Sequence, residues 1–157
     1  IFFQRYVKPN NNYCAVHIRS GDYKNNKYNF QEIGILSSNY YKSALSELNK
    51  THKGIDIVVI SDDEKWAKEI FSEIKISNRI IYLSDINNQF SDWECALSYL
   101  KNATALICAN SSFSALSAYI GQHENIYYPS PWMQGSSLKN ISPLEIKWTA
   151  IQSEFIQ

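Results

Sequence analysis

Several features that would point directly to a function are scarce or missing in this sequence of 157 residues. It has no apolar run approaching the ~18 residues of a membrane span, and residues 1–12 lack the basic start and apolar stretch of a signal peptide. Lys and Arg total 15, as do Asp and Glu, so the chain lacks the basic surplus of most nucleic-acid-binding proteins. The absence of a G-x-G-x-x-G or Walker motif argues against nicotinamide, flavin and ATPase functions.

Cysteine is also scarce. Cys14, Cys95 and Cys108 are widely spaced, with no C-x-x-C pair and no histidine at metal-binding spacing. Cys14 and Cys108 fall within apolar runs that look like strands. We therefore predict three buried free thiols in a reducing compartment, and no metal site.

The sequence does contain enough apolar material for a folded domain. Hydrophobic residues make up 45% of the chain and charged residues 19%, which excludes a disordered protein. A chain of this length is typical of one domain and buries roughly 68–70% of its unfolded surface. We expect a single domain over residues 1–157 that folds without disulfides or metal.

Short apolar runs predict β-strands that are covered on both faces. The residues are apolar at consecutive positions, whereas strands with one solvated face alternate. The predicted strands are Tyr13–Ile18, Ile55–Ile60, Arg79–Leu83, Ala105–Cys108 and Asn125–Tyr128. Helical stretches separate them, and this alternation predicts an α/β fold with a doubly wound parallel sheet and helices on both faces.

Apolar stripes at helical spacing mark the predicted helices. The stripes are Tyr40, Ala44, Leu45 and Leu48; Trp66, Ala67, Ile70, Phe71 and Ile74; Trp93, Ala96, Leu97 and Leu100; and Phe113, Leu116 and Ile120. Ser61 and Ser91 are each followed by a glutamate at the capping-box position, and Gly121 fits a C-cap. Gly21–Ser37 shows no clear period, and loops of such length are usually functional or disordered. Residues 129–157 are also less regular than the rest of the chain.

Polar residues follow each of the first four predicted strands. Open α/β sheets bind ligands outside the carboxyl ends of their strands, so these residues would share one rim. They lie in segments 17–23, 61–63, 84–92 and 109–114. Ser and Asp at such turns are also ordinary helix N-caps, so each segment has a purely structural interpretation as well.

His17 lies inside the first predicted strand and Arg19 follows two residues on, so we expect both side chains on the same face. A guanidinium there needs an anionic partner. The partner is either a carboxylate, Asp62 or Asp63, or a ligand phosphate, which suits a planar bidentate donor. The segment Asn110-Ser111-Ser112 opens a helix, whose N-terminal amides also favour an anion. An arginine and a helix N-terminus on one rim predict a diphosphate site.

Four segments resemble the α-1,2-fucosyltransferase family in order and spacing. They are HIRSGDY, SDD, DWECALSYLKNATALICANSSFSALSAYIG and PSPW, within roughly residues 14–150. The resemblance implies one half of a GT-B architecture, in which two Rossmann-like domains face each other across a cleft. These motifs belong to the C-terminal, donor-binding half, so we expect the N-terminal acceptor-side domain to be absent from this chain.

The resemblance also implies the reaction. Members transfer L-fucose from GDP-fucose to a galactose hydroxyl of a glycan, in α-1,2 linkage, with inversion and without a metal or other cofactor. Since the sequence shows neither a signal peptide nor a membrane span, we further expect a cytoplasmic protein that takes part in surface-glycan assembly at the inner face of the membrane. Its association with the membrane would be peripheral and made through the acceptor, and it would bind no nucleic acid.

Individual positions take their roles from the same resemblance. His17 and Arg19 stand where the family motif contacts GDP, with Arg19 on the β-phosphate. The other donor-binding positions are Asp62 and Asp63, which orient Arg19 or touch the ribose; Asp92, which reads the guanine edge; and Asn110, Ser111, Ser112 and Phe113, which hold the phosphates and line the nucleotide. Arg19 and the helix N-terminus would stabilise the departing diphosphate. Asp22 is the candidate base that takes the acceptor proton, or else a turn residue after Gly21.

Two departures from the family pattern keep other functions open. Ser20 replaces a second arginine, and the loss of that cation would weaken donor binding by about 1.5–3 kcal/mol. Ala115 and Leu116 replace paired tryptophans. The alternatives to an active transferase are a non-catalytic GDP-sugar-binding module of a divergent family member and a plain interaction domain.

Overall fold

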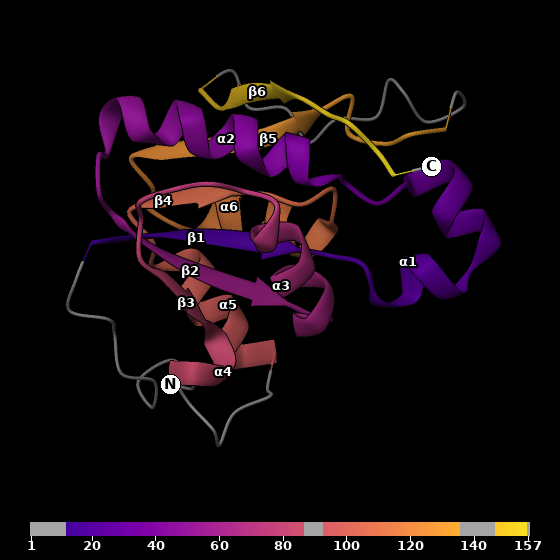
Figure 1. Ribbon diagram of the computed structural model, residues 1–157, viewed down its shortest axis with the longest axis horizontal. Helices are drawn as coiled ribbons and strands as arrows, with labels where there is room; N and C mark the ends of the chain where they lie inside the picture. The colour runs from indigo at the N-terminus through magenta and orange to yellow at the C-terminus, as the bar shows by residue number, and fades with distance from the viewer. Residues whose placement is uncertain (1–11, 87–92, 136–146, 157) are drawn as a thin grey trace.

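The predicted parallel sheet is present in the computed structural model, which describes residues 12–86, 93–135 and 147–156. The strands are β1 (Tyr13–Ile18), β2 (Asp56–Ser61), β3 (Ile80–Tyr82), β4 (Ala105–Ile107), β5 (Asn125–Ser130) and β6 (Thr149–Gln152). They form one six-stranded sheet in the order β3-β2-β1-β4-β5-β6, with every neighbouring pair parallel. Figure 1 shows this order from β6 at the top of the view to β3 below.

The strand order creates a single reversal point. The chain runs outward from β1 through β2 to β3, then returns to the other side of β1 and continues from β4 to β6. Ligand crevices of doubly wound sheets open at such a reversal, outside the carboxyl ends of the two central strands. Here those ends belong to β1 and β4, and in Figure 1 helix α1 (Gly21–Asn25) lies beyond the end of β1.

Helices cover both faces of the sheet, as predicted. Residues of β1 alternate between two cores, with Val16 and Ile18 in one and Tyr13 and Ala15 in the other. The first core includes helices α2 (Ser38–Thr51) and α3 (Glu64–Ser72), and the second includes α5 (Trp93–Lys101) and α6 (Ser112–Ile120). This arrangement confirms the Rossmann-like α/β fold.

The predicted apolar stripes are correct for one pair of helices and partly wrong for the other. The stripes of α2 and α3 are buried, apart from a half-buried Trp66. On α5, Leu97 and Leu100 are buried, but Trp93 is 63% exposed. On α6 only Phe113 of the expected stripe packs against the second core, whereas Leu116 is 50% and Ile120 45% exposed. The buried residues of α6 are the small ones, Ser114, Ser117 and Ala118, because small side chains let this helix approach its neighbours closely.

The predicted helix ends need one correction. The N-cap of α3 is Asp63 and not Ser61, because the Asp63 carboxylate accepts the backbone N–H of Trp66 at 3.0 Å. Ser61 instead accepts the N–H of Asp63 at 3.0 Å. Ser91 lies outside the described residues. Gly121 is the C-cap of α6, as predicted.

Elements that the sequence did not predict appear in both aperiodic segments. The first contains α1 and a π-helical turn, η2 (Asn29–Ile33), and the second contains β6. A short helix, α4 (Leu83–Ile86), also follows β3. The three cysteines are free and buried, as predicted. Among the described residues, no helix combines the length and the apolar character needed to cross a bilayer.

Candidate functional site

A cavity of about 850 Å³ opens at the carboxyl ends of the central strands. Its volume lies within the range of small-ligand pockets. The lining comes from the ends of β1, β2 and β3 and from the starts of α5 and α6. The predicted site residues that line it are His17, Arg19, Asp22, Asp62, Ser111, Ser112 and Phe113. The structure thus brings together the end of β1 and the N-terminus of α6, as the diphosphate-site hypothesis requires.

His17 lies on the face of the sheet that α6 covers. Its ring is 4% exposed, and Nδ1 shares a hydrogen bond with the hydroxyl of Ser114. The ring of Phe113 lies tilted against it, 5.7 Å between centroids. Burial, with a smaller effect of the Arg19 charge, lowers the pKa of His17 from 6.5 to about 3. The imidazole is therefore neutral at physiological pH.

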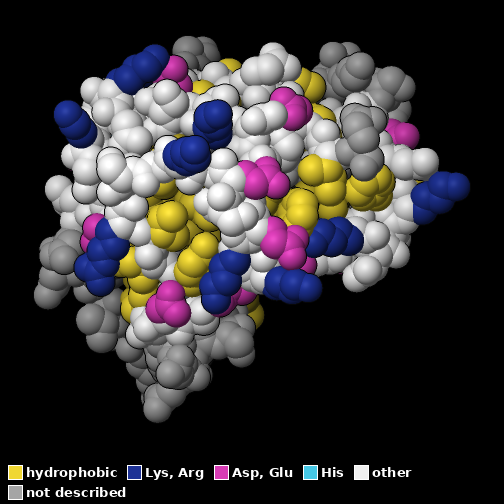
Figure 2. Space-filling model, in the orientation of Figure 1, with side chains coloured by type: hydrophobic (Ala, Val, Ile, Leu, Met, Phe, Trp, Pro, Cys, Tyr) yellow, Lys and Arg dark blue, Asp and Glu magenta, His cyan; other side chains and the backbone are white. Residues whose placement is uncertain are grey.

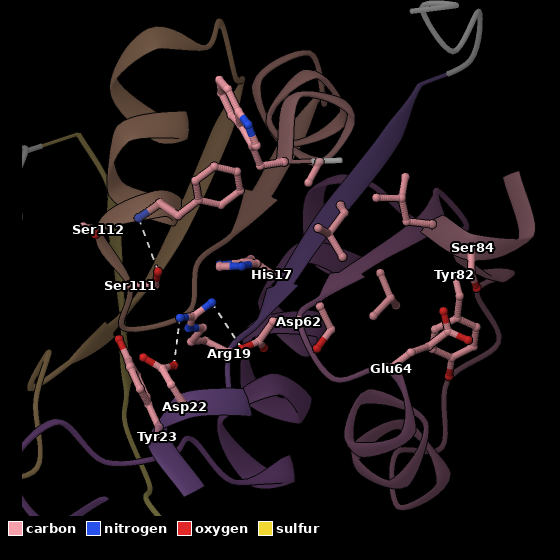
Figure 3. A pocket seen from close by; sticks show the side chains of 17 residues that line it. His17, Arg19, Asp22, Tyr23, Asp62, Glu64, Tyr82, Ser84, Ser111 and Ser112 are labelled. Carbon is pink, nitrogen blue, oxygen red and sulfur yellow. Dashed lines mark hydrogen bonds and ion pairs between the residues drawn. The ribbon is translucent and has the colours of Figure 1, made fainter. Parts of the chain in front are cut away.

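Arg19 is held by two carboxylates (Figure 3). Nη2 donates to Asp22 at 2.8 Å, and Nη1 lies 3.2 Å from Asp62. The guanidinium carbon is 5.5 Å from the centre of the Tyr23 ring. The sequence analysis left either a carboxylate or a ligand phosphate as the partner of Arg19, and the structure shows that carboxylates are present. The side chain is still one-third exposed and lines the cavity, so contact with a ligand phosphate stays a prediction.

Asp62 ties the segment after β1 to the end of β2. Its two oxygens accept the backbone N–H groups of Ser20 at 3.1 Å and Gly21 at 2.9 Å. A Cβ atom at position 21 would lie 2.5 Å from one of these oxygens, so glycine is needed for the close approach. Because Asp62 also pairs with Arg19, its contacts are those of a residue that orients the arginine. A contact with the ribose stays a prediction.

Two of the predicted donor-binding residues do not line the cavity. Asp63 caps α3 and pairs with Lys24 at 3.2 Å, and its pKa is lowered mainly by the hydrogen bond from the Trp66 backbone N–H. Asn110 donates from Nδ2 to the carbonyl oxygens of Ile33 at 3.0 Å and Gly34 at 2.9 Å. Both side chains therefore stabilise local structure. Asp92 lies outside the described residues.

The N-terminus of α6 borders the same cavity. Ser111 is its N-cap, and the Ser111 hydroxyl accepts the N–H of Phe113 at 3.3 Å. Ser112 and Phe113 begin the helix and line the cavity. The first amides of a helix have no acceptor within it, and the helix dipole adds positive potential there. This end of the cavity thus offers backbone donors beside Arg19.

Two tyrosines of α2 fix the chain where β1 and β4 end. The hydroxyl of Tyr40 donates to the carbonyl of Cys108 at 2.7 Å, and that of Tyr41 donates to the carbonyl of His17 at 3.3 Å. Both tyrosines are buried. The sequence analysis used Tyr40 only as an apolar position and did not single out Tyr41. A buried tyrosine usually finds a partner for its hydroxyl, and this rule could have suggested the role.

The far end of the cavity is formed by residues to which the sequence analysis gave no ligand role. Figure 3 shows Glu64, Tyr82 and Ser84 on the side opposite Asp22 and Ser111. Hydrogen bonds from Lys68, and to a lesser extent from Ser84, lower the pKa of Glu64. Trp93, the most exposed tryptophan described, also lines the cavity. Ser84 belongs to the polar segment 84–92 that the sequence analysis placed on the rim, whereas Trp93 was assigned to a core stripe.

The positions that depart from the family pattern lie away from the cavity lining. Ser20 is fully buried, and its hydroxyl donates to Asp63 at 3.4 Å. Lys24 pairs with the same Asp63 carboxylate, so a cation lies near Ser20, the position at which the family pattern has a second arginine. Leu116 points outward from α6, and Ala115 packs against the second core.

Charges of both signs are interspersed on the face of the protein that Figure 2 shows. Figure 2 shows lysine and arginine side chains among aspartate and glutamate on the face in view. In the part of the chain that the structure describes, no three His, Cys, Asp or Glu residues are grouped as metal ligands would be. Metal independence stays a prediction.

Comparison with known proteins supports the interpretation of the motifs. The sequence model of glycosyl transferase family 11 matches residues 4–152. The O-antigen biosynthesis glycosyltransferase WbnK of Escherichia coli is 27% identical over 143 residues, which cover 89% of this chain and 45% of WbnK. The chain therefore spans less than half the length of that relative.

Proposed function

This chain belongs to glycosyl transferase family 11, and from that membership and the cavity we propose that it binds the sugar-nucleotide donor of a fucosyltransferase. The donor is GDP-fucose, and the chain acts as the donor-binding half of a GT-B enzyme. The observation that carries the proposal is that Arg19, after β1, and Ser111–Ser112, at the start of α6, line one cavity. A diphosphate there meets a guanidinium and the N-terminus of α6.

The cavity also has room for the nucleoside. Its far end combines the aromatic surface of Tyr82 with the polar groups of Glu64 and Ser84, and the exposed ring of Trp93 also lines the cavity. Aromatic rings stack on bases and polar groups bind base edges or ribose hydroxyls. We place the nucleoside at this end, which leaves the fucose near Asp22 at the opposite end.

The proposed transfer inverts the sugar carbon and needs no metal. The bond between C1 of fucose and the β-phosphate oxygen breaks, and its electron pair stays on the departing GDP. Arg19 and the amides of α6 stabilise that charge, an effect typically worth about 10²–10³ in rate per donor. The oxygen of a galactose 2-hydroxyl forms the new bond to C1, which gives the α-1,2 linkage, and its proton passes to the carboxylate of Asp22. The Asp22 side chain is 55% exposed and so is accessible to an acceptor.

One observation favours the alternative of a donor-binding module without catalysis. Arg19 is the single cation among the lining residues described, and it shares the cavity with Asp22, Asp62 and Glu64. Nearby carboxylates oppose the binding of a diphosphate. Under this alternative the protein binds GDP-sugars but transfers no sugar even when an acceptor is supplied.

Calorimetry with GDP, GDP-fucose and GDP-mannose tests donor binding. We expect Arg19→Ala to weaken GDP binding by about 10- to 150-fold, the loss of a charged hydrogen bond of about 1.5–3 kcal/mol. The matched control is Arg79→Ala, which removes the same charge at the opposite edge of the sheet, where Arg79 is 75% exposed. A well-folded chain that binds no guanine nucleotide, or an Arg19→Ala variant that binds like the parent, rejects the proposal. In the full-length protein that contains this half, GDP-fucose binding without transfer to a galactose-terminated glycan supports the module.

A further inference from the structure

We propose that Ser114 is a positioning residue that holds His17 as its Nε2–H tautomer, so that a neutral imidazole donates a hydrogen bond into the cavity. The inference rests on the proposed function, because the acceptor of this bond is taken to be an oxygen of the donor's diphosphate. It adds a second side-chain donor beside Arg19 and excludes His17 as the base of the reaction.

The hydroxyl of Ser114 has two partners. Ser114 lies in the first turn of α6 and has no exposed surface. Its Oγ accepts the backbone N–H of Ala109 at 3.1 Å, and the same Oγ contacts Nδ1 of His17. Among the described residues, Nδ1 is the only acceptor within reach of the hydroxyl proton. The contact therefore joins a buried hydroxyl to one particular ring nitrogen.

This pairing decides which nitrogen of His17 carries the proton. If the hydroxyl of Ser114 donates to Nδ1, every polar group at the contact is satisfied and the ring proton sits on Nε2. In the opposite tautomer, Nδ1–H would donate to Oγ, and the buried hydroxyl proton would have no acceptor among the described residues. A buried donor without a partner is unfavourable, so the Nε2–H tautomer is preferred.

The geometry presents Nε2 to a ligand. His17 lines the cavity with Arg19 and Phe113, and Nδ1 is engaged by Ser114, so Nε2 is the nitrogen left for binding. The tilted ring of Phe113 limits rotation of the imidazole. The lowered pKa, about 3, keeps the ring uncharged, so it supplies a donor without adding to the charge of the site. Phosphate oxygens accept such hydrogen bonds well.

The tautomer can be measured directly in the unmodified chain. Long-range ¹H–¹⁵N NMR spectra distinguish Nε2–H from Nδ1–H, and the signals of His17 are assigned as those missing from His17→Gln. The other two histidines, His52 and His123, remain as internal references. We expect Nε2–H for His17 in the absence of nucleotide. A proton on Nδ1, or a mixture of both tautomers, overturns the inference whatever the protein binds.

Matched variants of α6 test the consequence for binding. Ser114→Ala should weaken GDP binding about fivefold, the value of about one neutral hydrogen bond. Ser117→Ala is the control, since Ser117 is equally buried on the same helix but donates to the carbonyl of Phe113 at 2.8 Å. We expect its GDP binding to be unchanged. Equal effects of the two alanine variants, or none, overturn the inference.

Two further variants cover the case in which Ser114→Ala does not fold. The side-chain amide of glutamine places a nitrogen near the position of Nε2, whereas that of asparagine places one near Nδ1. His17→Gln should therefore retain more affinity for GDP than His17→Asn, and the reverse order contradicts the inference. If the parent chain binds no GDP, the proposed function fails, and the NMR result alone decides the tautomer.

Discussion

The two faces of the sheet differ in what their helices turn inward. On one face, α2 and α3 bury large apolar residues such as Leu45 and Phe71. On the other, α6 buries Ser114, Ser117 and Ala118 and leaves Leu116 and Ile120 about half exposed. The first face supplies more of the large apolar residues. Its tyrosines Tyr40 and Tyr41 do not line the cavity, and their hydroxyls hold the backbone at the ends of β1 and β4. The α6 face brings a helix N-terminus and the hydroxyl of Ser114 to the end of β1, and the small inward residues of α6 allow this close approach.

The largest expected difference between the faces is in stability. Leu45→Ala should lower the free energy of unfolding by about 2–5 kcal/mol, because Leu45 of α2 is fully buried in the first core. Leu116→Ala, the same substitution on the outward side of α6, should change it by less than about 0.5 kcal/mol. Urea unfolding of both variants measures this. A cost at Leu116 close to that at Leu45 would mean that the outward side of α6 is covered by another surface in solution.

The pH dependence of stability should reveal the buried histidine on the α6 face. The unfolded chain takes up a proton on His17 near pH 6.5, whereas the folded chain does so only near pH 3. Between these values the unfolded state holds more protons, so stability falls as the pH falls, by about 1.4 kcal/mol per unit. Unfolding curves of the parent and His17→Gln at pH 7 and pH 5 isolate this contribution. If both proteins lose the same stability between pH 7 and pH 5, His17 is not buried in neutral form.

A third test adds volume to the small inward side of α6. Ser117→Val should cost about 1–3 kcal/mol, because Ser117 has no exposed surface and its neighbours must move to admit the larger side chain. Leu116→Val one position earlier serves as the control and should be nearly neutral. Thermal unfolding compares the two. If Ser117→Val stabilises the protein instead, α6 is not closely packed against its neighbours.

The sequence predicted the layout of the fold well, for a physical reason. Strands covered on both faces need consecutive apolar residues, so β1 and β2 could be placed almost to the residue. Strand β6 was missed because Ile151 is its only buried residue, and its formation depends on pairing with β5, which local sequence does not encode. The orientation of α6 was missed because periodicity identifies an apolar stripe but not whether that stripe faces the sheet.

The site was predictable to the same extent. Residues that follow the central strands, such as Arg19 and Ser111, could be placed at one rim because parallel strands end on the same edge. Neighbours in sequence could not be told apart, since Asp62 and Asp63 both follow β2 but only Asp62 lines the cavity. The contact of His17 with Ser114 joins residues 97 positions apart and requires the packed structure.

The smallest expected effects are at Asp62 and Asp63, which are adjacent in sequence but differ in role. Asp62 lines the cavity, whereas Asp63 caps α3 on the face opposite α6. Asp62→Asn should weaken GDP binding about threefold to tenfold, since Arg19 loses a charged partner that orients it. Asp63→Asn should leave GDP binding within about twofold and stability within about 0.5 kcal/mol, because asparagine caps helices as well as aspartate does. Calorimetry with GDP on both variants measures this. The opposite order of effects would place Asp63, and not Asp62, in contact with the nucleotide, and would mean that the capped end of α3 rearranges when the donor binds.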